Sequence, residues 1–266
     1  MIPLPDVFRR LPLAHRALHD IEDGRPENSR AAIRAAMKAG YGIEIDLQLS
    51  SDGRAMVFHD YDLGRLTGAK GPVQQRSASD LGQIGLKGGD EGIPTFAEVL
   101  EIVGGRVPLL VELKDQHGQM GQGDGRLETA VARDVAGYGG PLALMSFNPH
   151  SVTTLRELAP AVPRGLTTCG YRRVNWPLLK SGVREHLRAI PDFDRAGAGF
   201  ISHDSKDLDN PRVADLRAEG AAILCWTIRS RQCRKRCAVA GRQYHVRGVS
   251  AGRAVLIHMV LATDRG

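Results

Sequence analysis

Short apolar runs alternate along this chain with polar segments of helical length, and this alternation limits the folds open to it. Most runs are rich in Val, Ile and Leu without polar alternation, which is typical of strands covered on both faces. Strands that alternate with helices of this size indicate βαβ units and a parallel sheet. The predicted strands are Leu11–His15, Gly42–Leu49, Ala55–His59, Pro108–Lys114, Leu142–Phe147, Arg164–Cys169, Gly199–His203 and Ala222–Ile228. The predicted helices are Ser29–Ala39, Thr95–Val103, Arg126–Gly137, His150–Leu158 and Pro211–Glu219.

One connection is too short to join parallel strands. Five residues, SSDGR, separate the second predicted strand from the third. A parallel crossover needs about a dozen residues, so these strands are predicted to form an antiparallel hairpin that turns at Asp52-Gly53. This pairing would place His59 almost opposite Asp46.

The predicted fold class is therefore α/β, as a (β/α)8 barrel with a hairpin after its second strand. The return strand of the hairpin lies outside the count, which leaves seven barrel strands and requires an eighth after Ile228. No linker, low-complexity segment or internal repeat divides the sequence, so one domain is expected to span residues 1–266.

The composition is that of an ordinary globular domain, with 266 residues, 42% hydrophobic and 25% charged. No stretch approaches the roughly 18 apolar residues that span a bilayer. The first ten residues lack an apolar core long enough for export, so a cytoplasmic protein without an integral membrane segment is expected. The four cysteines complete no tetrahedral zinc set and are expected to be free thiols.

Three acidic residues lie within the apolar strands. Glu44 and Asp46 are two residues apart and share one face of their strand, and Glu112 lies in the next predicted barrel strand. The carboxyl ends of barrel strands meet at one face, where active sites form. Three acids buried there are costly unless positive charge neutralises them. Together they would form an all-oxygen site of the kind that hard divalent cations prefer.

Two basic residues beside these acids offer an alternative. Arg16 follows the first strand and Lys114 ends the strand that carries Glu112. Glu44 and Glu112 could therefore pair with these cations in purely structural ion pairs, which also perturb titration.

Two histidines also end strands, His15 and His59. Each is a weak signal alone, because a histidine at a strand end is often a hydrogen-bonded core residue. Beside three carboxylates, the pair fits general acid–base chemistry near neutral pH.

These motifs and several further short segments follow one another in a fixed order along the chain. In chain order they are His15-Arg16, Pro26-Glu27-Asn28-Ser29, Glu44-Ile45-Asp46, Asp52-Gly53, His59-Asp60, Glu112-Leu113-Lys114, Ser146-Phe147 and Cys225-Trp226-Thr227. Over roughly residues 11–230 the pattern resembles the glycerophosphodiester phosphodiesterase family, in its cytoplasmic bacterial type. The resemblance implies a TIM barrel that hydrolyses glycerophosphodiesters to sn-glycerol 3-phosphate and an alcohol. It also implies one divalent cation, magnesium or calcium with manganese as a further candidate, held by Glu44, Asp46 and Glu112.

The resemblance implies roles for the neighbouring polar residues. With the cation, Arg16 and Lys114 are expected to neutralise charge on the phosphoryl oxygens. His15 is assigned as the base and His59 as the acid, although the sequence does not order them. The neighbouring glycerol hydroxyl is expected to attack first and give a cyclic phosphate.

Three further positions bear on the substrate pocket. Glu27 is expected to support the site, with a first-turn helix acid as the alternative. Trp226 is expected either to line the glycerol pocket or to belong to the core. Ala17 stands where the family usually has Gly, which permits positive φ or close backbone approach, so the entrance is expected to differ there.

The segment after Ile228 departs from the family pattern of a helix and a final barrel strand. From Arg229 to the end, nine Lys and Arg stand against one acid, Asp264, whereas the rest holds 27 basic and 29 acidic residues. The net charge of +6 therefore belongs to residues 231–266 and their immediate flank.

We attribute this atypical tail to a frameshift near Arg229–Arg231. Residues 243–249 read QYHVRGV, and a suitable coding sequence gives NITFEGY, a family-like ending, in the next frame. Tyr244–Val249 retains the β character to act as the eighth strand, and Val255–Leu261 is an apolar run that would pack on the barrel or stay exposed. Sequencing the gene across this region tests the hypothesis.

Other functions compete with this one. A related phospholipase-type barrel phosphodiesterase shares the histidines and the acidic site, and would need a membrane-facing rim. A catalytically impaired binding barrel would fit the altered tail. Nucleic-acid binding through Arg231–Arg236 lacks interleaved aromatic residues and a recognisable fold, so the expected partner is a small-molecule substrate and no nucleic acid.

Overall fold

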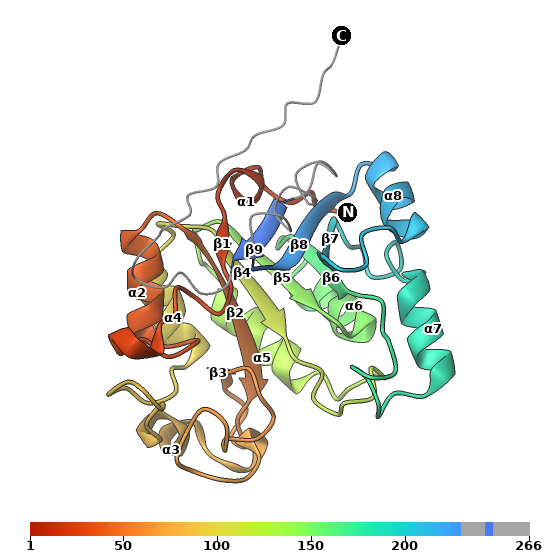
Figure 1. Cartoon of the computed structure of the whole chain (residues 1–266). Helices are drawn as coiled ribbons and strands as arrows, with labels where there is room; N and C mark the ends of the chain where they lie inside the picture. The colour runs from red at the N-terminus through yellow and green to blue at the C-terminus, as the bar shows by residue number, and fades with distance from the viewer. Residues whose placement is uncertain (230–242, 247–266) are drawn as a thin grey trace.

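The computed structural model describes residues 1–229 and 243–246, and these residues form a closed barrel of parallel strands (Figure 1). The barrel strands are β1 (Leu13–Ala14), β2 (Gly42–Leu49), β4 (Leu109–Leu113), β5 (Leu142–Ser146), β6 (Arg164–Thr168), β7 (Phe200–Asp204), β8 (Ala222–Ile228) and β9 (Gln243–Val246). Each pairs in parallel with its neighbours, and β1 joins β2 to β9. The predicted barrel is confirmed, and β9 is the eighth strand that the sequence left open.

A short strand outside the barrel order, β3 (Ala55–Val57), pairs antiparallel with β2. Leu47 lies opposite Val57 in this pairing, and the amide of Phe58 donates to the carbonyl of Asp46 at 2.9 Å. The segment that leads to His59 is therefore held against the middle of the acidic strand.

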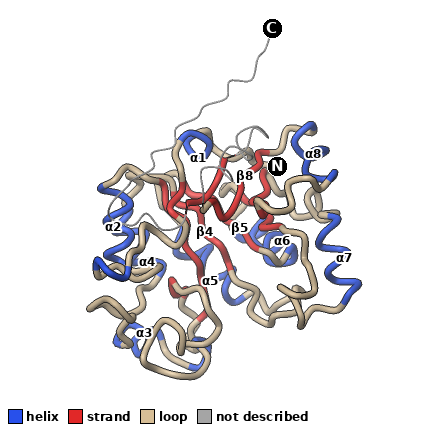
Figure 2. Tube along the Cα trace, in the orientation of Figure 1, coloured by secondary structure: helices blue, strands red, loops and turns tan. Residues whose placement is uncertain are grey.

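Helices cover the outside of the barrel between successive strands (Figure 2). They are α2 (Arg30–Lys38), α4 (Phe96–Val103), α5 (Arg126–Val135), α6 (Pro149–Leu158), α7 (Ser181–Ala189) and α8 (Pro211–Ala218). Short side chains before several helices explain where these begin. Ser29, Thr95 and Asn148 each accept a hydrogen bond from a first-turn amide, and Thr95 forms a capping box with Glu98.

The two faces of each strand serve different cores, as the period of two requires. In β2, Ile43 and Ile45 face outward into the cluster under α2 and α4, whereas Glu44 and Asp46 occupy the alternate positions. In β4, Leu110 belongs to the lower barrel interior, and Glu112 follows on the same face. The interior is thus apolar at its base and acidic toward the carboxyl ends of the strands.

Two segments extend this frame. The helix α1 (Val7–Arg10) places Phe8 in the cluster at the base of the barrel interior. After β3 an insert carries η2 (Val73–Gln75) and α3 (Ala78–Gln83) on a small core of its own. A further short turn, η1 (Ile21–Asp23), lies in the loop after β1.

Gly165 in β6 is packed too closely to accept a side chain. A Cβ there would lie 2.5 Å from Cδ2 of Phe200, a fully buried ring in β7. We expect Gly165→Ala to lower the free energy of unfolding by about 1–3 kcal/mol, measured by urea denaturation, because the core must shift to admit a methyl group. Gly182→Ala in α7 is the control, since its Cβ would meet nothing within 4 Å and no loss is expected. Equal effects of the two substitutions would contradict the packing argument.

The predicted strands agree with the observed ones to within two residues at most ends, and the five predicted helices are present. The sequence analysis missed α1, α3 and α7. The proposed frameshift site from residue 230 onward and the run Val255–Leu261 lie outside the described residues, as do Cys233 and Cys237. The described cysteines, Cys169 and Cys225, are both buried. In the part of the chain that the structure describes, no helix is long and apolar enough to cross a membrane.

Candidate active site

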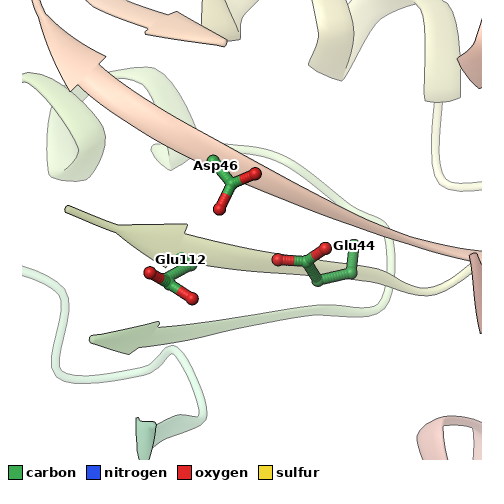
Figure 3. A group of neighbouring side chains, drawn as sticks. All are labelled: Glu44, Asp46 and Glu112. Atoms are coloured by element: carbon green, nitrogen blue, oxygen red, sulfur yellow. The ribbon is translucent and has the colours of Figure 1, made fainter. Parts of the chain in front are cut away.

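The three predicted acids converge inside the barrel (Figure 3). Asp46 of β2 lies directly beside Glu112 of β4 in the strand register, and Glu44 lies two residues nearer the base. Oxygen atoms from all three carboxylates lie within 4.8 Å of one another, and the residues are 1%, 1% and 5% exposed for Glu44, Asp46 and Glu112. This geometry brings together the complete acidic set that the sequence proposed.

The acidic set suits a divalent cation. All its donors are carboxylate oxygens, the ligands that hard cations take. Burial, followed by the neighbouring Asp46 and Glu112 carboxylates, raises the pKa of Glu44 well above its usual value. Part of this rise in the pKa of Glu44 comes from negative charge on Asp46 and Glu112 that the neighbouring cations do not fully neutralise. Glu44, Asp46 and Glu112 could therefore hold a cation between them.

Lys114 already neutralises part of this charge. Its Nζ lies 2.6 Å from Oδ1 of Asp46 and is also hydrogen-bonded to Glu112. Burial alone would raise the pKa of Asp46, but Lys114, His59 and Arg16 outweigh it and hold that pKa well below its usual value. The ion pair between Glu112 and Lys114 that the alternative predicted is therefore present.

Glu44 and Arg16 interact differently. The main-chain amide of Arg16 donates to Oε2 of Glu44 at 2.9 Å, while its guanidinium is directed to Glu27 at 2.7 Å and lies 3.6 Å from Asp46. Arg16 and Ala17 have φ of 55° and 61°, in the left-handed region that glycine favours. The family preference for Gly after His-Arg has a backbone cause here, and Ala17 adopts that conformation at a cost of about 1 kcal/mol.

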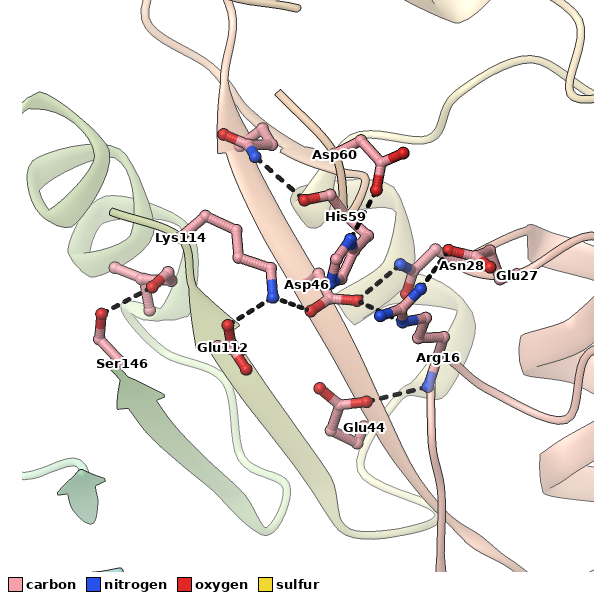
Figure 4. A network of polar contacts seen from close by, with 12 residues as sticks. Arg16, Glu27, Asn28, Glu44, Asp46, His59, Asp60, Glu112, Lys114 and Ser146 are labelled. Carbon is pink, nitrogen blue, oxygen red and sulfur yellow. Dashed lines mark hydrogen bonds and ion pairs between the residues drawn. The ribbon is translucent and has the colours of Figure 1, made fainter. Parts of the chain in front are cut away.

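Glu27 lies in a charged network beside the acids, and its alternative as a first-turn helix acid is wrong. It precedes Ser29, the N-cap of α2, and the first turn of this helix contains no acid. Its carboxylate, 6% exposed, accepts hydrogen bonds from Arg16 and from Arg65 at 2.7 and 2.8 Å. Figure 4 shows the part of this charged network that surrounds Asp46. Arg65 also binds Asp60, at 2.7 Å, and so continues the network from the barrel to the insert.

His59 is oriented by this network. Its Nδ1 lies 2.6 Å from Oδ1 of Asp60, and the carbonyl of His59 accepts a hydrogen bond from Gln48 at 3.1 Å. With Nδ1–H donating to the carboxylate, Nε2 is left for proton transfer. His15, from the end of β1, lies near enough to help lower the pKa of Asp46. Both predicted histidines therefore lie close enough to the acidic set to act on Asp46.

Asn28, quoted in the sequence pattern without a role, contacts the acids directly. Its Nδ2 donates to Oδ2 of Asp46 at 3.0 Å, and the residue is 1% exposed with a φ of 60°. Asp46 is thus held by Lys114 on one oxygen and by Asn28 on the other. Neither Asn28 nor Arg65 could be placed from strand periodicity, since both lie in loops.

Ser146 of the sequence pattern has a structural contact. Its Oγ donates to the carbonyl of Leu113 at 2.7 Å and accepts from the amide of Asn148 at 3.1 Å. It therefore ties the end of β5 to the end of β4, beside the acidic set.

Trp226 lies apart from the charged network, in an aromatic cluster. Its ring packs edge-on against Phe147 at 5.6 Å between centroids, and Phe147 contacts Tyr171 and Trp176. Trp226 is held by a hydrogen bond from Nε1 to the carbonyl of Ser202 at 2.9 Å. Burial, then Cys169 and Glu112, raises the pKa of Tyr171, so the cluster borders the acids. We call these four aromatic residues, Phe147, Tyr171, Trp176 and Trp226, the apolar wall.

Arg65→Ala tests the charged network. Burial would raise the pKa of Glu27 and of Asp60, but their hydrogen bonds hold both pKa values below the ordinary 4.5 and 3.8. A carboxylate whose pKa is lower in the folded state stabilises the fold at any pH above its pKa in the unfolded state. This contribution is lost as the pH falls through its pKa in the folded state. We expect a loss of about 1 kcal/mol at pH 7, kept small because Arg65 is 46% exposed, and a smaller loss at pH 3.

Urea denaturation at the two pH values measures this difference. Arg34→Ala is the control, because Arg34 forms an exposed pair with Glu91 outside the network. A loss for Arg65→Ala that is the same at pH 3 and pH 7 would show that the network contributes no charge-dependent stability.

Comparisons with known proteins agree with this site. The family model described as the glycerophosphoryl diester phosphodiesterase family matches residues 15–252. A glycerophosphodiester phosphodiesterase of Caldanaerobacter subterraneus is 31% identical over 61% of this chain and 69% of its own length. One from Bacillus subtilis is 26% identical over 83% and 77%.

Solved structures share the fold. An Oleispira antarctica phosphodiesterase in complex with its product sn-glycerol-3-phosphate aligns with a TM-score of 0.73 at 23% identity, over 91% of this chain and 94% of that one. A glycerophosphodiester phosphodiesterase from Thermotoga maritima aligns with a TM-score of 0.66 at 21% identity, over 90% and 94%. The chain therefore belongs to the glycerophosphoryl diester phosphodiesterase family, whose members are phosphoric diester hydrolases.

Proposed function

We propose that this protein hydrolyses glycerophosphodiesters to sn-glycerol 3-phosphate and an alcohol, with one divalent cation and two catalytic histidines. The observation that carries the proposal is the buried set of Glu44, Asp46 and Glu112, with two histidines close enough to lower the pKa of Asp46. Family membership supports the reaction class, and the Oleispira relative binds the same product.

The cation would be held by Glu44, Asp46 and Glu112. When bound, magnesium or calcium supplies positive charge that stabilises the phosphoryl oxygens as the transition state forms. Manganese has the same preference for oxygen ligands. The three carboxylates also fix the side chains around them, since Lys114 and Asn28 both donate to Asp46.

Arg16 and Lys114 bind the phosphate group of the substrate. Both are cations at the mouth of the barrel whose side chains are only 12% and 13% exposed. Charge-assisted hydrogen bonds in such a partly dry site are stronger than in water, and they become stronger still as negative charge develops. Glu27 positions the Arg16 guanidinium for this contact.

The histidines move protons. His15 removes the proton of the glycerol hydroxyl beside the phosphoester, and this oxygen attacks phosphorus. The new P–O bond forms as the bond to the alcohol breaks, and His59 gives its Nε2 proton to the departing oxygen. Water then opens the cyclic phosphate with the proton roles reversed. Trp226 lines the apolar side of the pocket against the glycerol carbons.

A cytoplasmic location and a small-molecule substrate belong to the same proposal. Cys169 is a free thiol, which is compatible with a reducing compartment.

Hydrolysis of glycerophosphocholine and glycerophosphoethanolamine tests the function, read as release of sn-glycerol 3-phosphate with and without added magnesium or calcium. Release that both EDTA and His15→Ala abolish supports the proposal. Activity that persists in EDTA contradicts the cation, and activity that persists in His15→Ala contradicts the base.

A second hydrolysis assay tests whether the altered tail affects activity. If the folded protein releases no product, the assay is repeated on a chain with the predicted reading frame restored after residue 230. Recovery of activity assigns the failure to the tail, whereas continued inactivity contradicts the proposed substrate.

A further inference from the structure

The loop between β6 and α7 exposes apolar side chains at the edge of the barrel. Val174 and Leu178 are 83% and 79% exposed, the two highest values among the large hydrophobic residues that the structure describes. Exposed apolar side chains are common singly, but two on one short loop are unusual enough to indicate an interaction. We call residues 171–180 the docking rim.

The docking rim lies on the active-site face. It follows the carboxyl end of β6, where the site of a barrel forms, and leads into α7 at the outer edge of the molecule (Figure 1). Its inner side is anchored, because Trp176 and Tyr171 pack on Phe147 at 5.2 and 6.3 Å between ring centroids. Phe147 in turn contacts Trp226, so the rim is an extension of the apolar wall of the site.

Positive charge surrounds the exposed apolar side chains. From residue 172 to residue 188 the chain has five basic residues against one acid, Glu185. The basic residues are Arg172, Arg173, Lys180, Arg184 and Arg188. The first three are exposed within the docking rim itself. Apolar side chains flanked by cations, with a tryptophan among them, are the pattern of a segment that lies in the interface of an anionic bilayer.

We propose that the docking rim binds the surface of an anionic lipid bilayer and inserts Val174 and Leu178 among the lipid headgroups. A protein partner fits less well, because a stable interface buries about 800 Å² on each side and two side chains on a narrow loop supply only a small part of that. A bilayer needs no matched surface, only apolar insertion and opposite charge. Docking would turn the mouth of the barrel toward the membrane.

The docked orientation adds a class of substrate to the proposed function, and this part of the inference rests on that function. Glycerophosphodiesters that retain one acyl chain, the lysophospholipids, reside in the bilayer. A docked rim would let such a substrate enter along the apolar wall formed by Trp226 and Phe147. The binding itself is measured without any substrate, so failure of docking and failure of the reaction are distinguishable.

Vesicle sedimentation of the full chain tests the docking. We expect binding to vesicles of phosphatidylglycerol and phosphatidylcholine, and at least about tenfold weaker binding for the double variant Val174→Ser, Leu178→Ser. Leu158→Ser is the matched control, since Leu158 is 44% exposed at the end of α6 on the opposite face of the barrel. Hydrolysis of soluble glycerophosphocholine by the double variant should stay at the wild-type level.

Charge variants separate the docking rim from other basic positions on the surface. We expect Arg172→Glu with Arg173→Glu to weaken binding to anionic vesicles by at least about tenfold. Arg217→Glu, at the last turn of α8, is the control and should change binding little. Equal losses in both charge variants would assign the interaction to general surface charge. Binding that is unchanged by both would show that these arginines do not contact the vesicle. Either result would overturn the proposal.

Tryptophan fluorescence reports the position of the docking rim. The chain contains two tryptophans, so Trp226→Phe leaves Trp176 as the only emitter. On vesicles its emission should shift to shorter wavelength and be quenched by brominated lipids. Binding without quenching would place the contact elsewhere. Dimerisation that the serine double variant abolishes, in a protein that ignores vesicles, would identify a second copy as the occupant.

Discussion

His59→Ala is expected to lower the kcat of glycerophosphodiester hydrolysis by about 10²–10⁴-fold, the usual contribution of a general acid or base. The hydrogen bond from Nδ1 to Asp60 presents the other ring nitrogen to the departing oxygen. Without this proton donor the alcohol would leave as an alkoxide, which is a poor leaving group. Steady-state release of sn-glycerol 3-phosphate from glycerophosphocholine measures the loss.

The same experiment can order the two histidines. A substrate whose leaving group is p-nitrophenolate needs no proton in the first step, so His59→Ala should release p-nitrophenolate in the first turnover at close to the wild-type rate. His15→Ala should remain impaired on both substrates, because the attacking hydroxyl is unchanged. His186→Ala, in α7, is the control for loss of a histidine outside the site. The reverse pattern of recovery would exchange the acid and the base.

Asp60→Asn separates positioning from catalysis. The amide retains the shape of the side chain but carries no charge, so the orientation of His59 is weakened while its ring remains. A reduction much smaller than that of His59→Ala, with a shifted pH profile, indicates a positioning residue. A loss equal to that of His59→Ala would indicate that the charged network is as important as the ring.

Strand positions of the site could be predicted because they follow local rules. The spacing of two between Glu44 and Asp46 places both on the same face of the strand, whatever the rest of the chain does. Glu112 joined them because its strand is the next one in the barrel order. The eighth strand could be nominated from β propensity alone, but its pairing with β1 and β8 depends on the closure of the whole sheet.

Loop positions could not be predicted, because tertiary contacts determine them. Arg65 lies in the insert after β3, where no hydrophobic period indicates which residues fold back over the site. Glu27 was assigned two roles since a helix follows it, and the structure excludes one of them because the first turn of that helix contains no acid. Its contacts to Arg16 and Arg65 could not be read from the sequence. The helix α7 was missed because its N-cap, Lys180, makes no side-chain cap.

Removal of one carboxylate from the acidic set should change the stability of the protein in opposite directions without and with a bound cation. Without metal, three buried acids repel one another, and two of the neighbours raise the pKa of Glu44. Glu44→Gln removes part of this repulsion and leaves both ion pairs of Lys114 intact. In EDTA we therefore expect Glu44→Gln to be at least as stable as the wild type, measured as Tm by calorimetry.

Added magnesium or calcium should reverse this order. At 100 times the dissociation constant, a cation that binds only the folded state stabilises it by about 2.7 kcal/mol, which is about 5–10 °C in Tm for a chain of this size. The wild type should show this increase together with activity, and Glu44→Gln should lose both. Glu157→Gln, an exposed residue of α6, should behave as the wild type. A wild-type Tm and activity that neither EDTA nor added cation changes would show that Lys114 and Arg16 neutralise the acids alone, and that the site works without a metal.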